Sequence, residues 1–448
     1  MKRVLTIAGS DSGGGAGIQA DLKTITVLGE YGFSVLTALT AQNTRGVQGV
    51  LDAPIDFIRL QMDSVLSDIG ADAAKTGMLA RSDIVKAVAA RLRTYQVPNL
   101  VVDPVMVAAS GDRLLAPDAV KTLREELIPL ADLVTPNLAE AEVLCGFPVT
   151  NPDEMKTAAK EIHKLGPKAV LIKGGHLKDR ALDLLFDGRS FSTFETARIE
   201  TRNTHGTGCT LSAALATFLA KGCDLIEAVR QAKSFITLAI KSGLAIGQGH
   251  GPTNPFAWVA RWKERDQVLT ELKQALDELL GQPLGRLVPE IRSNLGYALS
   301  SASGPEDVAA VPGRITQIGD RLVALAEPAF GSSRHIAKVI LAAMNHHPGL
   351  RSAMNIRYSP EILEACRKID YTLASFDRSE EPAEVKAREG SSLEWGTGKA
   401  LAGLAEPPDA VYDLGERGKE PVIRVLGRTP REVVEKVQAI HDQWTGRI

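Results

Sequence analysis

The first 260 residues alternate short apolar runs with longer amphipathic segments, and this alternation restricts the possible folds more than any other feature. Apolar runs at 4–8, 33–40, 73–79, 100–106, 133–136 and 169–173 are typical of buried strands, and helical patterns follow them. Strands that are apolar throughout belong to parallel sheets covered by helices on both faces. The sequence therefore predicts an α/β fold with a mainly parallel sheet in this part of the chain.

A glycine-rich octapeptide, Asn203–Thr210, precedes the small apolar run Leu211–Ala220. That run is typical of a buried helix, so the glycines stand at its N-terminus. The unpaired N–H groups and the dipole of a helix N-terminus attract anions, and Gly206 and Gly208 let the backbone approach one closely. Cys209 then stands where the anion meets an attacking group. Two interpretations stay open: an anion site, or a glycine turn that only begins a core helix.

Polar side chains follow several of the predicted strands. Asp103 and Lys173 each end a strand, and Asn137 and Glu140 follow another. Because ligands gather at the carboxyl ends of parallel strands, a site is favoured over a turn for Asp103. Asn137 and Glu140 are also spaced as a helix N-cap and its capping-box acid, so that structural role stays open. Gln42 ends the run 33–40 with an amide that suits a ring carrying both donors and acceptors.

Composition excludes several classes of partner. The net charge is −2 with no long run of one sign, so neither nucleic acid nor an anionic membrane is predicted as a partner. No run reaches the ~18 apolar residues of a membrane span, and the apolar run 4–8 is too short for a signal peptide. The four cysteines form neither a CxxC pair nor a metal-ligand spacing, so we expect thiols in a reducing cytoplasm.

Seven motifs occur in order within residues 1–262. They are GSDSGGGAGIQADLK at 9–23, AQNTRG at 41–46, KTGM at 75–78, DPVM at 103–106, PNLAE at 136–140, KGGH at 173–176 and GTGC at 206–209. Together they resemble the hydroxymethylpyrimidine and phosphomethylpyrimidine kinases of thiamine biosynthesis, in the ribokinase-like superfamily. The resemblance implies two ATP-dependent phosphorylations, which convert 4-amino-5-hydroxymethyl-2-methylpyrimidine into its monophosphate and then its diphosphate. It also implies Mg²⁺ and a homodimer formed through the kinase. A pyridoxal kinase, which admits a different ring, is an alternative.

The resemblance assigns roles to the matching residues. Gly206, Gly208 and Cys209 are the expected catalytic residues: backbone N–H groups form an anion hole, and the helix N-terminus is expected to lower the pKa of the thiol so that it accepts a proton. The resemblance implies that the pyrimidine substrate is bound by Gln42, Asp21, Met78 and Val105. It implies that ATP is bound by Asn137, Glu140, Lys173 and Thr207. The metal ion is expected to be held by Asn137, Glu140 and Asp103. One position departs from the family: Ala109 replaces a lysine, so a phosphate contact from that lysine is absent or supplied elsewhere.

Beyond Trp262 the pattern changes, and we expect a second α/β domain at 263–448, with 263–280 as its linker or first helix. Within it, Phe330–Met344 reads as a helix that begins with a glycine and two serines. Arg334 and His335 stand in its first turn. Two cationic side chains there oppose the helix dipole, so a bound anion is favoured over a solvated surface.

Motifs at 312–314, 331–335, 355–358 and 375–378 resemble the non-barrel thiamine-phosphate synthase domain found fused behind this kinase in archaea and some bacteria. The resemblance implies that the pyrimidine diphosphate is joined to hydroxyethylthiazole phosphate, with release of pyrophosphate. It makes Arg314 and His335 catalytic, and it makes Ser332, Ser333, Arg334, Arg357 and Arg378 substrate-binding residues. The alternative is a ligand-sensing, non-catalytic rear domain. The favoured hypothesis is a bifunctional cytoplasmic transferase with small-molecule substrates.

Overall fold

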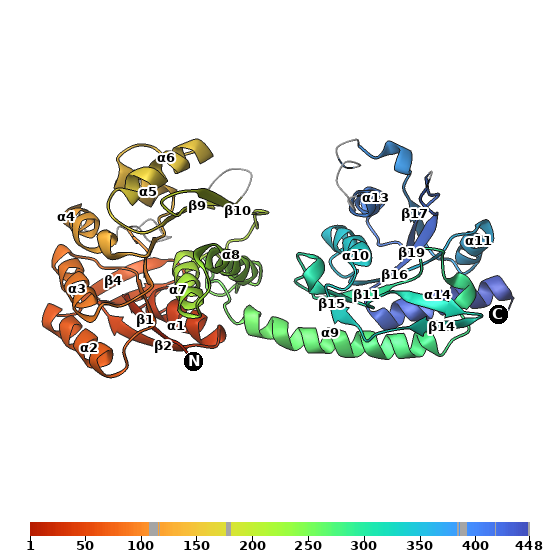
Figure 1. The fold of residues 1–448 in the computed structure, drawn as a ribbon, viewed down its shortest axis with the longest axis horizontal. Coiled ribbons are helices and arrows are strands. Elements are labelled where there is room, and N and C mark those ends of the chain that lie inside the picture. The colour runs from red at the N-terminus through yellow and green to blue at the C-terminus, as the bar shows by residue number, and fades with distance from the viewer. Residues whose placement is uncertain are drawn as a thin grey trace. The chain divides into compact units, whose positions relative to one another are not determined.

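The computed structural model describes residues 1–106, 115, 117–175, 181–382, 385, 392–416 and 418–446. The chain divides into two compact units, Met1–Val259 and Ala260–Ile448, called the front and rear units below. The division falls inside one long helix, α9 (Ala257–Leu280), which also contains the boundary expected at residue 262 (Figure 1). Val268, Leu272, Leu276 and Leu279 of α9 are buried in the core of the rear unit.

The front unit is built on one eight-stranded sheet with the order β10-β9-β8-β7-β6-β5-β1-β2. Its strands are β1 (Arg3–Ala8), β2 (Tyr31–Leu36), β5 (Ala73–Thr76), β6 (Leu100–Val102), β7 (Leu133–Val134), β8 (Val170–Gly174), β9 (Ala181–Phe186) and β10 (Phe191–Thr196). The strands β2, β1, β5, β6, β7 and β8 pair in parallel, and the pairs β8–β9 and β9–β10 are antiparallel. The predicted mainly parallel sheet is therefore confirmed.

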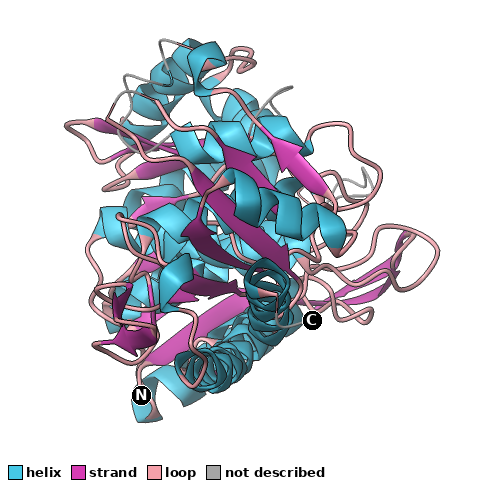
Figure 2. Ribbon diagram, turned by 90° about the vertical axis from the view of Figure 1, so that its right-hand side faces the viewer, coloured by secondary structure: helices cyan, strands magenta, loops and turns pink. Residues whose placement is uncertain are grey.

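Helices cover both faces of this sheet (Figures 1 and 2). One face packs against α1 (Gly17–Val27), α7 (Thr207–Ala220) and α8 (Leu225–Lys241). The other packs against α2 (Ile55–Asp68), α3 (Ser82–Tyr95), α4 (Pro117–Thr122), α5 (Leu138–Cys145) and α6 (Pro152–His163). Within β6, Leu100 and Val102 enter the second core and Val101 the first, because successive strand residues point to opposite faces.

The apolar run 33–40 forms two strands where the sequence predicts one. After β2 the chain leaves the sheet at Thr37, and β3 (Ala38–Asn43) pairs with β4 (Gly46–Asp52) in a separate antiparallel ribbon. Thr37 is buried at the break, where its N–H donates to the Ala8 carbonyl at 3.0 Å and its hydroxyl to the Met78 carbonyl at 2.8 Å. The bond to Ala8 is the last one between β1 and β2, and beyond it the chain continues into β3, so Gln42 stands on the ribbon and not on the main sheet.

The rear unit contains a seven-stranded sheet with the order β15-β12-β11-β16-β19-β18-β17. Its strands are β11 (Leu295–Ala298), β12 (Val308–Ala310), β15 (Ala329–Phe330), β16 (Ser352–Arg357), β17 (Leu373–Ser375), β18 (Ala410–Asp413) and β19 (Val422–Gly427), beside a hairpin of β13 (Ile315–Ile318) and β14 (Arg321–Ala324). All pairs except β17–β18 are antiparallel, so this α/β unit differs in topology from the front unit.

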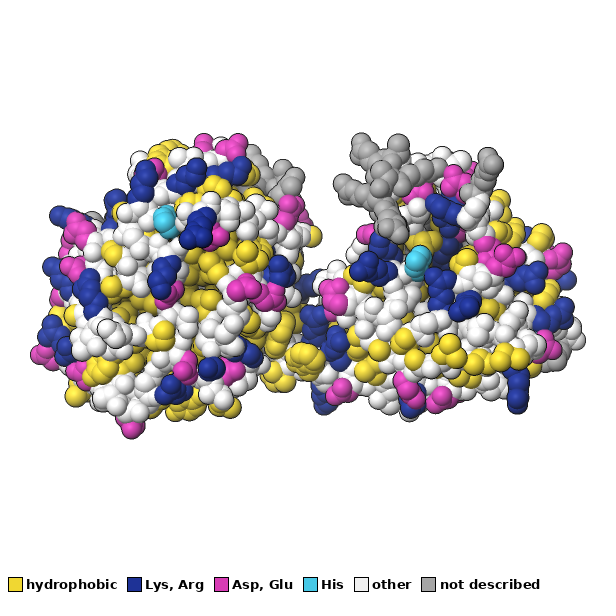
Figure 3. Space-filling model, viewed as in Figure 1, with side chains coloured by type: hydrophobic (Ala, Val, Ile, Leu, Met, Phe, Trp, Pro, Cys, Tyr) yellow, Lys and Arg dark blue, Asp and Glu magenta, His cyan; other side chains and the backbone are white. Residues whose placement is uncertain are grey.

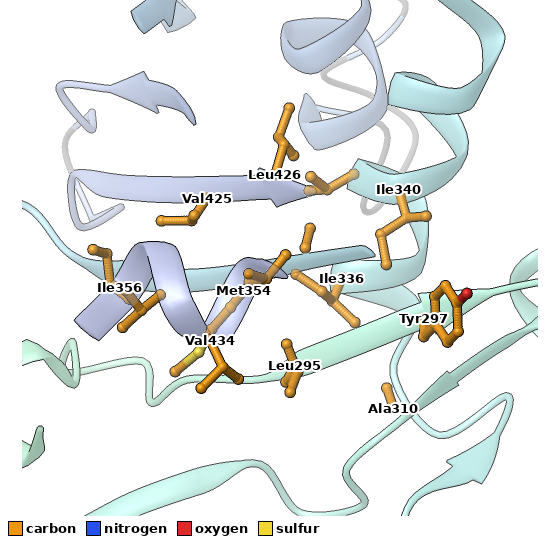
Figure 4. Close-up of a cluster of buried hydrophobic side chains, with 14 of the residues drawn as sticks. Leu295, Tyr297, Ala310, Ile336, Ile340, Met354, Ile356, Val425, Leu426 and Val434 are labelled. Carbon is orange, nitrogen blue, oxygen red and sulfur yellow. The ribbon is translucent and has the colours of Figure 1, made fainter. Parts of the chain in front are cut away.

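Besides α9, the described helices of this unit include α10 (Arg334–His346), α11 (Pro360–Lys368), α13 (Ser392–Leu401) and α14 (Pro430–Thr445). Side chains from α10 and α14 meet those of β11, β16 and β19 in one apolar core, as Ile336, Leu295 and Val434 show in Figure 4. Among the described helices of the whole chain, none is both long and apolar enough to span a membrane.

Candidate active sites

In the front unit, the loop after β1 lies directly against the head of α7. Gly206 is the N-cap of α7 and adopts φ 79°, a left-handed conformation that glycine tolerates best. A Cβ at Gly206 would lie 1.8 Å from the carbonyl oxygen of Gly15. Because no side chain fits there, glycine at 206 is required by both backbone conformation and packing.

The first turn of α7 has the properties of the expected anion hole. The N–H groups of Gly208 and Cys209 come too early in the helix to have intrahelical acceptors. A Cβ at Gly208 would lie 3.5 Å from both Asp103 Oδ2 and Lys173 Nζ, so charged groups from two strand ends reach this turn. Thr207 turns away, since its hydroxyl donates to the Thr204 carbonyl at 2.7 Å.

Asp103, Glu140 and Lys173 form a charged cluster at the carboxyl edge of the sheet. Lys173 Nζ lies 2.8 Å from Asp103 Oδ1 and 3.9 Å from Glu140 Oε2. Burial acts to raise the pKa of Asp103, but Lys173 and Lys75 lower it below its ordinary value. Burial raises the pKa of Glu140 to about 7, with Lys173 opposing the shift and Asp103 adding to it. The predicted meeting of Asp103, Glu140 and Lys173 at one sheet edge is thus present in the structure.

Asn137 and Glu140 also form the capping box of α5. The Asn137 side chain accepts from the Glu140 N–H at 2.9 Å, and Glu140 Oε2 accepts from the Asn137 N–H at 2.8 Å. The structural role that the spacing left open is therefore real. Glu140 combines this capping role with its contact to Lys173, because the same carboxylate accepts from the Asn137 N–H and lies near the Lys173 ammonium group.

The expected lowering of the Cys209 pKa is wrong. Burial raises the pKa of this thiol to about 11; Lys75 acts to lower it, while the carboxylates of Asp21 and Asp103 raise it further. The helix N-terminus is outweighed by burial and by nearby negative charge. Cys209 therefore stands at the predicted place as a thiol and not as a thiolate.

The remaining residues predicted to bind substrate in the front unit differ in how far they are buried. Asp21 is fully buried, where it accepts from Lys75 Nζ at 2.9 Å and from the Thr6 hydroxyl at 2.6 Å. It lies beneath the site and presents no group to a ligand. The Met78 side chain lies against Gly9, and Val105 follows the Asp103 turn half-buried.

Gln42 is held close to the glycine loop. Its backbone N–H donates to the Ser12 hydroxyl oxygen at 2.8 Å, and its side-chain Oε1 lies 3.2 Å from the Thr40 hydroxyl. Two further residues lie in this neighbourhood: Asp11 of the motif at 9–23 and His205 of the octapeptide Asn203–Thr210, for which the sequence predicts no role. His205 Nε2 lies 2.8 Å from Asp11 Oδ2 and 3.4 Å from Gln42 Nε2. An acid followed by closely spaced glycines was the available signal for Asp11, since such an acid can accept several backbone N–H groups.

The rear unit places Arg314 near His335. Arg314 follows Gly313 in a tight loop, has φ 72°, and donates to the Ile291 carbonyl. Partial desolvation of the ring lowers the pKa of His335 even though the residue is exposed, and the positive charges of Arg314 and Lys338 lower it further. His335 is exposed in the first turn of α10, and Ser333 is the N-cap of that helix. The face of this unit seen in Figure 3 carries basic side chains gathered around one histidine.

The other residues predicted to bind substrate in the rear unit differ in how exposed their side chains are. Ser332 is half-buried beside the N-cap, and Arg334 and Arg357 are exposed. Arg378 differs: it is buried, its Nε donates to Asp413 Oδ1 at 2.6 Å, and its Nη2 donates to Asp413 Oδ2 at 3.2 Å. Arg424 also contacts Asp413, at 2.8 Å. The direct substrate contact expected of Arg378 does not fit this burial, because its guanidinium is already held by a carboxylate.

Ala109 and His176, which belong to the quoted motifs, lie outside the described residues.

Comparison with known proteins assigns the two units to families. The family described as phosphomethylpyrimidine kinase matches residues 11–254, and the family described as thiamine-phosphate synthase ThiN matches residues 271–439. The hydroxymethylpyrimidine/phosphomethylpyrimidine kinase of Rhizobium meliloti is 55% identical over 265 residues, which are 58% of this chain and 98% of that protein.

A bifunctional relative and a solved structure each match a little more than half of this chain. The thiamine biosynthesis bifunctional protein ThiED of Geobacter sulfurreducens is 55% identical over 252 residues; these cover 56% of this chain, and the chain spans only 51% of that protein. The ADP complex of Bacillus subtilis pyridoxal kinase superposes with a TM-score of 0.55 at 45% identity, covering 57% of this chain and 98% of that one.

Because the kinase family accounts for more than half of the chain and its relatives have the same ribokinase-like fold, ATP use follows for the front unit. The chain belongs to the phosphomethylpyrimidine kinase family, and it joins that kinase to a ThiN-type thiamine-phosphate synthase domain in one bifunctional enzyme of thiamine biosynthesis.

Proposed function

We propose that the front unit phosphorylates 4-amino-5-hydroxymethyl-2-methylpyrimidine twice and that the rear unit joins the resulting diphosphate to hydroxyethylthiazole phosphate. The observation that carries the first half is the head of α7, where the N–H groups of Gly208 and Cys209 stand beside Lys173. Phosphoryl transfer needs positioning and charge stabilisation more than covalent help. Because the Cys209 pKa is raised, the transfer relies on this charge stabilisation and not on a preformed thiolate.

Mg²⁺ fits the charged cluster of the front unit. Asp103 and Glu140 supply carboxylate oxygens, the ligands that Mg²⁺ prefers, at the sheet edge where the anion hole opens. Among the described residues no three His, Cys, Asp or Glu side chains form a complete cage, which suits a cation held by one or two carboxylates, waters and phosphates. When bound, the cation would neutralise charge on the phosphates of ATP. Asn137 is the weaker candidate, because its side-chain oxygen already accepts from Glu140.

For the rear unit, the proposal rests on the approach of Arg314 to His335 beside the N-terminus of α10. Breaking the bond between the pyrimidine methylene carbon and the diphosphate leaves negative charge on the leaving group. Arg314, Arg334 and the N–H groups at the head of α10 would stabilise that charge, and Ser332 and Ser333 would donate to phosphate oxygens. The thiazole nitrogen would then bond to the methylene carbon.

The test is a coupled reaction. The full chain is incubated with ATP, Mg²⁺, the hydroxymethylpyrimidine and thiazole phosphate, and the products are separated by chromatography. Thiamine phosphate and pyrophosphate support both halves of the proposal. Phosphorylated pyrimidine alone would contradict the synthase reaction and favour a ligand-sensing rear domain. Pyridoxal in place of the pyrimidine tests the ring specificity, and a faster turnover of pyridoxal would contradict the proposed substrate.

We also propose a cytoplasmic homodimer. The ribbon of β3 and β4 exposes Leu39, Val50 and Leu51, and α2, which follows it, exposes Phe57 and Leu60. Exposed apolar side chains gathered on neighbouring elements are typical of an interface. All four cysteines are free thiols, which suits a reducing compartment. Sedimentation equilibrium of the full chain tests the dimer, and a monomer at micromolar concentration would contradict it.

A further inference from the structure

Asp11 is a buried carboxylate that collects hydrogen bonds from the glycine loop. Its Oδ1 accepts from the Gly13 N–H at 2.8 Å, and its Oδ2 accepts from the N–H groups of Gly15 at 3.0 Å and Ala16 at 2.8 Å. Burial acts to raise the pKa of Asp11, but His205 and the backbone donors lower it below its ordinary value. Asp11 is therefore ionised and can only accept hydrogen bonds.

This state of Asp11 fixes the proton on His205. His205 Nε2 lies 2.8 Å from Asp11 Oδ2, and since the carboxylate only accepts, Nε2 must carry a proton and donate it. The backbone of His205 is held independently, because its N–H donates to the Gly251 carbonyl at 3.0 Å and its carbonyl accepts from the Thr253 N–H at 3.1 Å. The ring is also confined by Gly15, where a Cβ would lie 2.5 Å from His205 Cδ2.

The same imidazole nitrogen faces Gln42. Gln42 Nε2 lies 3.4 Å from His205 Nε2, and both nitrogens are donors while Asp11 is ionised. The Gln42 amide hydrogens therefore have no acceptor in His205. If His205 instead carried its proton on Nδ1, Nε2 would become an acceptor at hydrogen-bond distance and would bind the Gln42 amide.

We infer that Asp11 and His205 are a positioning pair that keeps the Gln42 amide N–H groups available for the substrate ring. The inference deepens the proposed kinase function and rests on it, because a ring nitrogen of the aminopyrimidine is the acceptor that Gln42 would meet. His205 directly precedes Gly206, so the pair also ties ring recognition to the anion hole. Neither residue touches the reacting atoms in this assignment; both act through Gln42.

The test is a double-mutant cycle on the full chain, with the KM for the hydroxymethylpyrimidine, the KM for ATP and kcat measured separately. Asp11→Asn removes the acceptor-only group and lets His205 Nε2 accept from Gln42. We expect the KM for the pyrimidine to rise by about tenfold, the effect of losing one substrate hydrogen bond, while the KM for ATP stays within about twofold. His205→Phe removes the competing nitrogen, so in that background Asp11→Asn should leave the pyrimidine KM unchanged.

The controls separate this inference from simpler explanations. Asp153→Asn, an exposed carboxylate on α6, should leave all three constants unchanged. An equal rise of the pyrimidine KM on Asp11→Asn in both backgrounds would overturn the inference, as would a His205→Phe variant whose pyrimidine KM lies about tenfold above that of the wild type. The second comparison holds even if Asp11→Asn does not fold. A wild-type chain that does not phosphorylate the pyrimidine would contradict the proposed function itself, which keeps the two failures distinct.

Discussion

Gly206 faces the carbonyl oxygen of Gly15 so closely that a Cβ at 206 would lie 1.8 Å from it. The contact joins the loop after β1, which leads to Asp11, to the helix head that carries Cys209. Two segments almost two hundred residues apart in the sequence are thus packed backbone to backbone beside the proposed phosphoryl-transfer site.

Gly206→Ala should therefore abolish phosphorylation. The added Cβ meets backbone, and alanine at φ 79° is strained as well, so we expect kcat/KM of the kinase to fall by at least about 100-fold, similar to losing an oxyanion-hole donor. Gly222→Ala at the other end of α7 is the matched control, because it has φ 89° but nothing within 4 Å of the added Cβ. Equal losses in the two variants would show that backbone conformation alone is responsible.

The raised pKa of Cys209 predicts its reactivity. At neutral pH the thiol is protonated, so alkylation by iodoacetamide should be slow and should rise about tenfold per pH unit until the pH approaches about 11. Mass spectrometry of the labelled peptide over pH 7–10 measures this directly, with Cys223, which is half-buried like Cys209, as an internal reference. A kinase pH profile with an inflection from Cys209 near pH 7 would contradict the assignment.

The comparison of sequence with structure shows which properties are local. The parallel sheet could be predicted because each apolar strand and each helix start is encoded within a few residues, as at Leu100–Val102. The break at Thr37 could not, because the run stays apolar across it, whereas the partner that the Thr37 hydroxyl finds there, the Met78 carbonyl, lies forty-one residues away in the sequence. The prediction of a lowered Cys209 pKa was wrong for the same reason. The helix N-terminus can be predicted from the sequence, whereas the burial of the thiol and its proximity to Asp21 cannot.

In the rear unit, too, the motifs predict some side-chain contacts and not others. Arg314 and His335 could be placed near one another through their motifs alone. Arg378 could not be placed correctly, because the sequence gives no sign that Asp413, thirty-five residues later, holds its guanidinium. A cationic residue in a motif indicates an anion partner, but only the fold decides whether that partner is a ligand or a carboxylate of the same chain.

His335 should show a pH dependence that Arg314 controls. Partial desolvation and the Arg314 charge lower the pKa of His335 below its ordinary value, so the histidine is neutral at pH 7 and gains its proton only in more acidic solution. Synthase activity, measured with supplied pyrimidine diphosphate, should fall on the acid side of that pKa. Arg314→Met removes one of the lowering charges and should move the acid limb to higher pH, besides reducing kcat. His335→Ala should abolish thiamine phosphate formation and leave phosphorylation by the front unit unchanged.

The buried group of Arg378, Asp413 and Arg424 predicts how the rear unit responds to mutation and acid. Asp413→Asn leaves two buried guanidinium groups without their carboxylate, so we expect the free energy of unfolding of this unit to fall by about 3 kcal/mol. Burial opposes the shift, but both arginines lower the pKa of Asp413 below its ordinary value. The stabilisation is therefore complete above the unfolded pKa of about 4 and is lost as the pH falls through the lower folded value.

Urea unfolding of the full chain, followed by Trp395 and Trp444 fluorescence at pH 7 and pH 3.5, measures both effects. The exposed turn residue Asp320 provides the control, because Asp320→Asn should change the unfolding free energy by less than about 0.5 kcal/mol. In Asp413→Asn the difference in stability between the two pH values should shrink, since the titrating carboxylate is gone. A variant as stable as the wild type would mean that the two guanidinium groups find other acceptors, and that Arg378 is then available to a ligand after all.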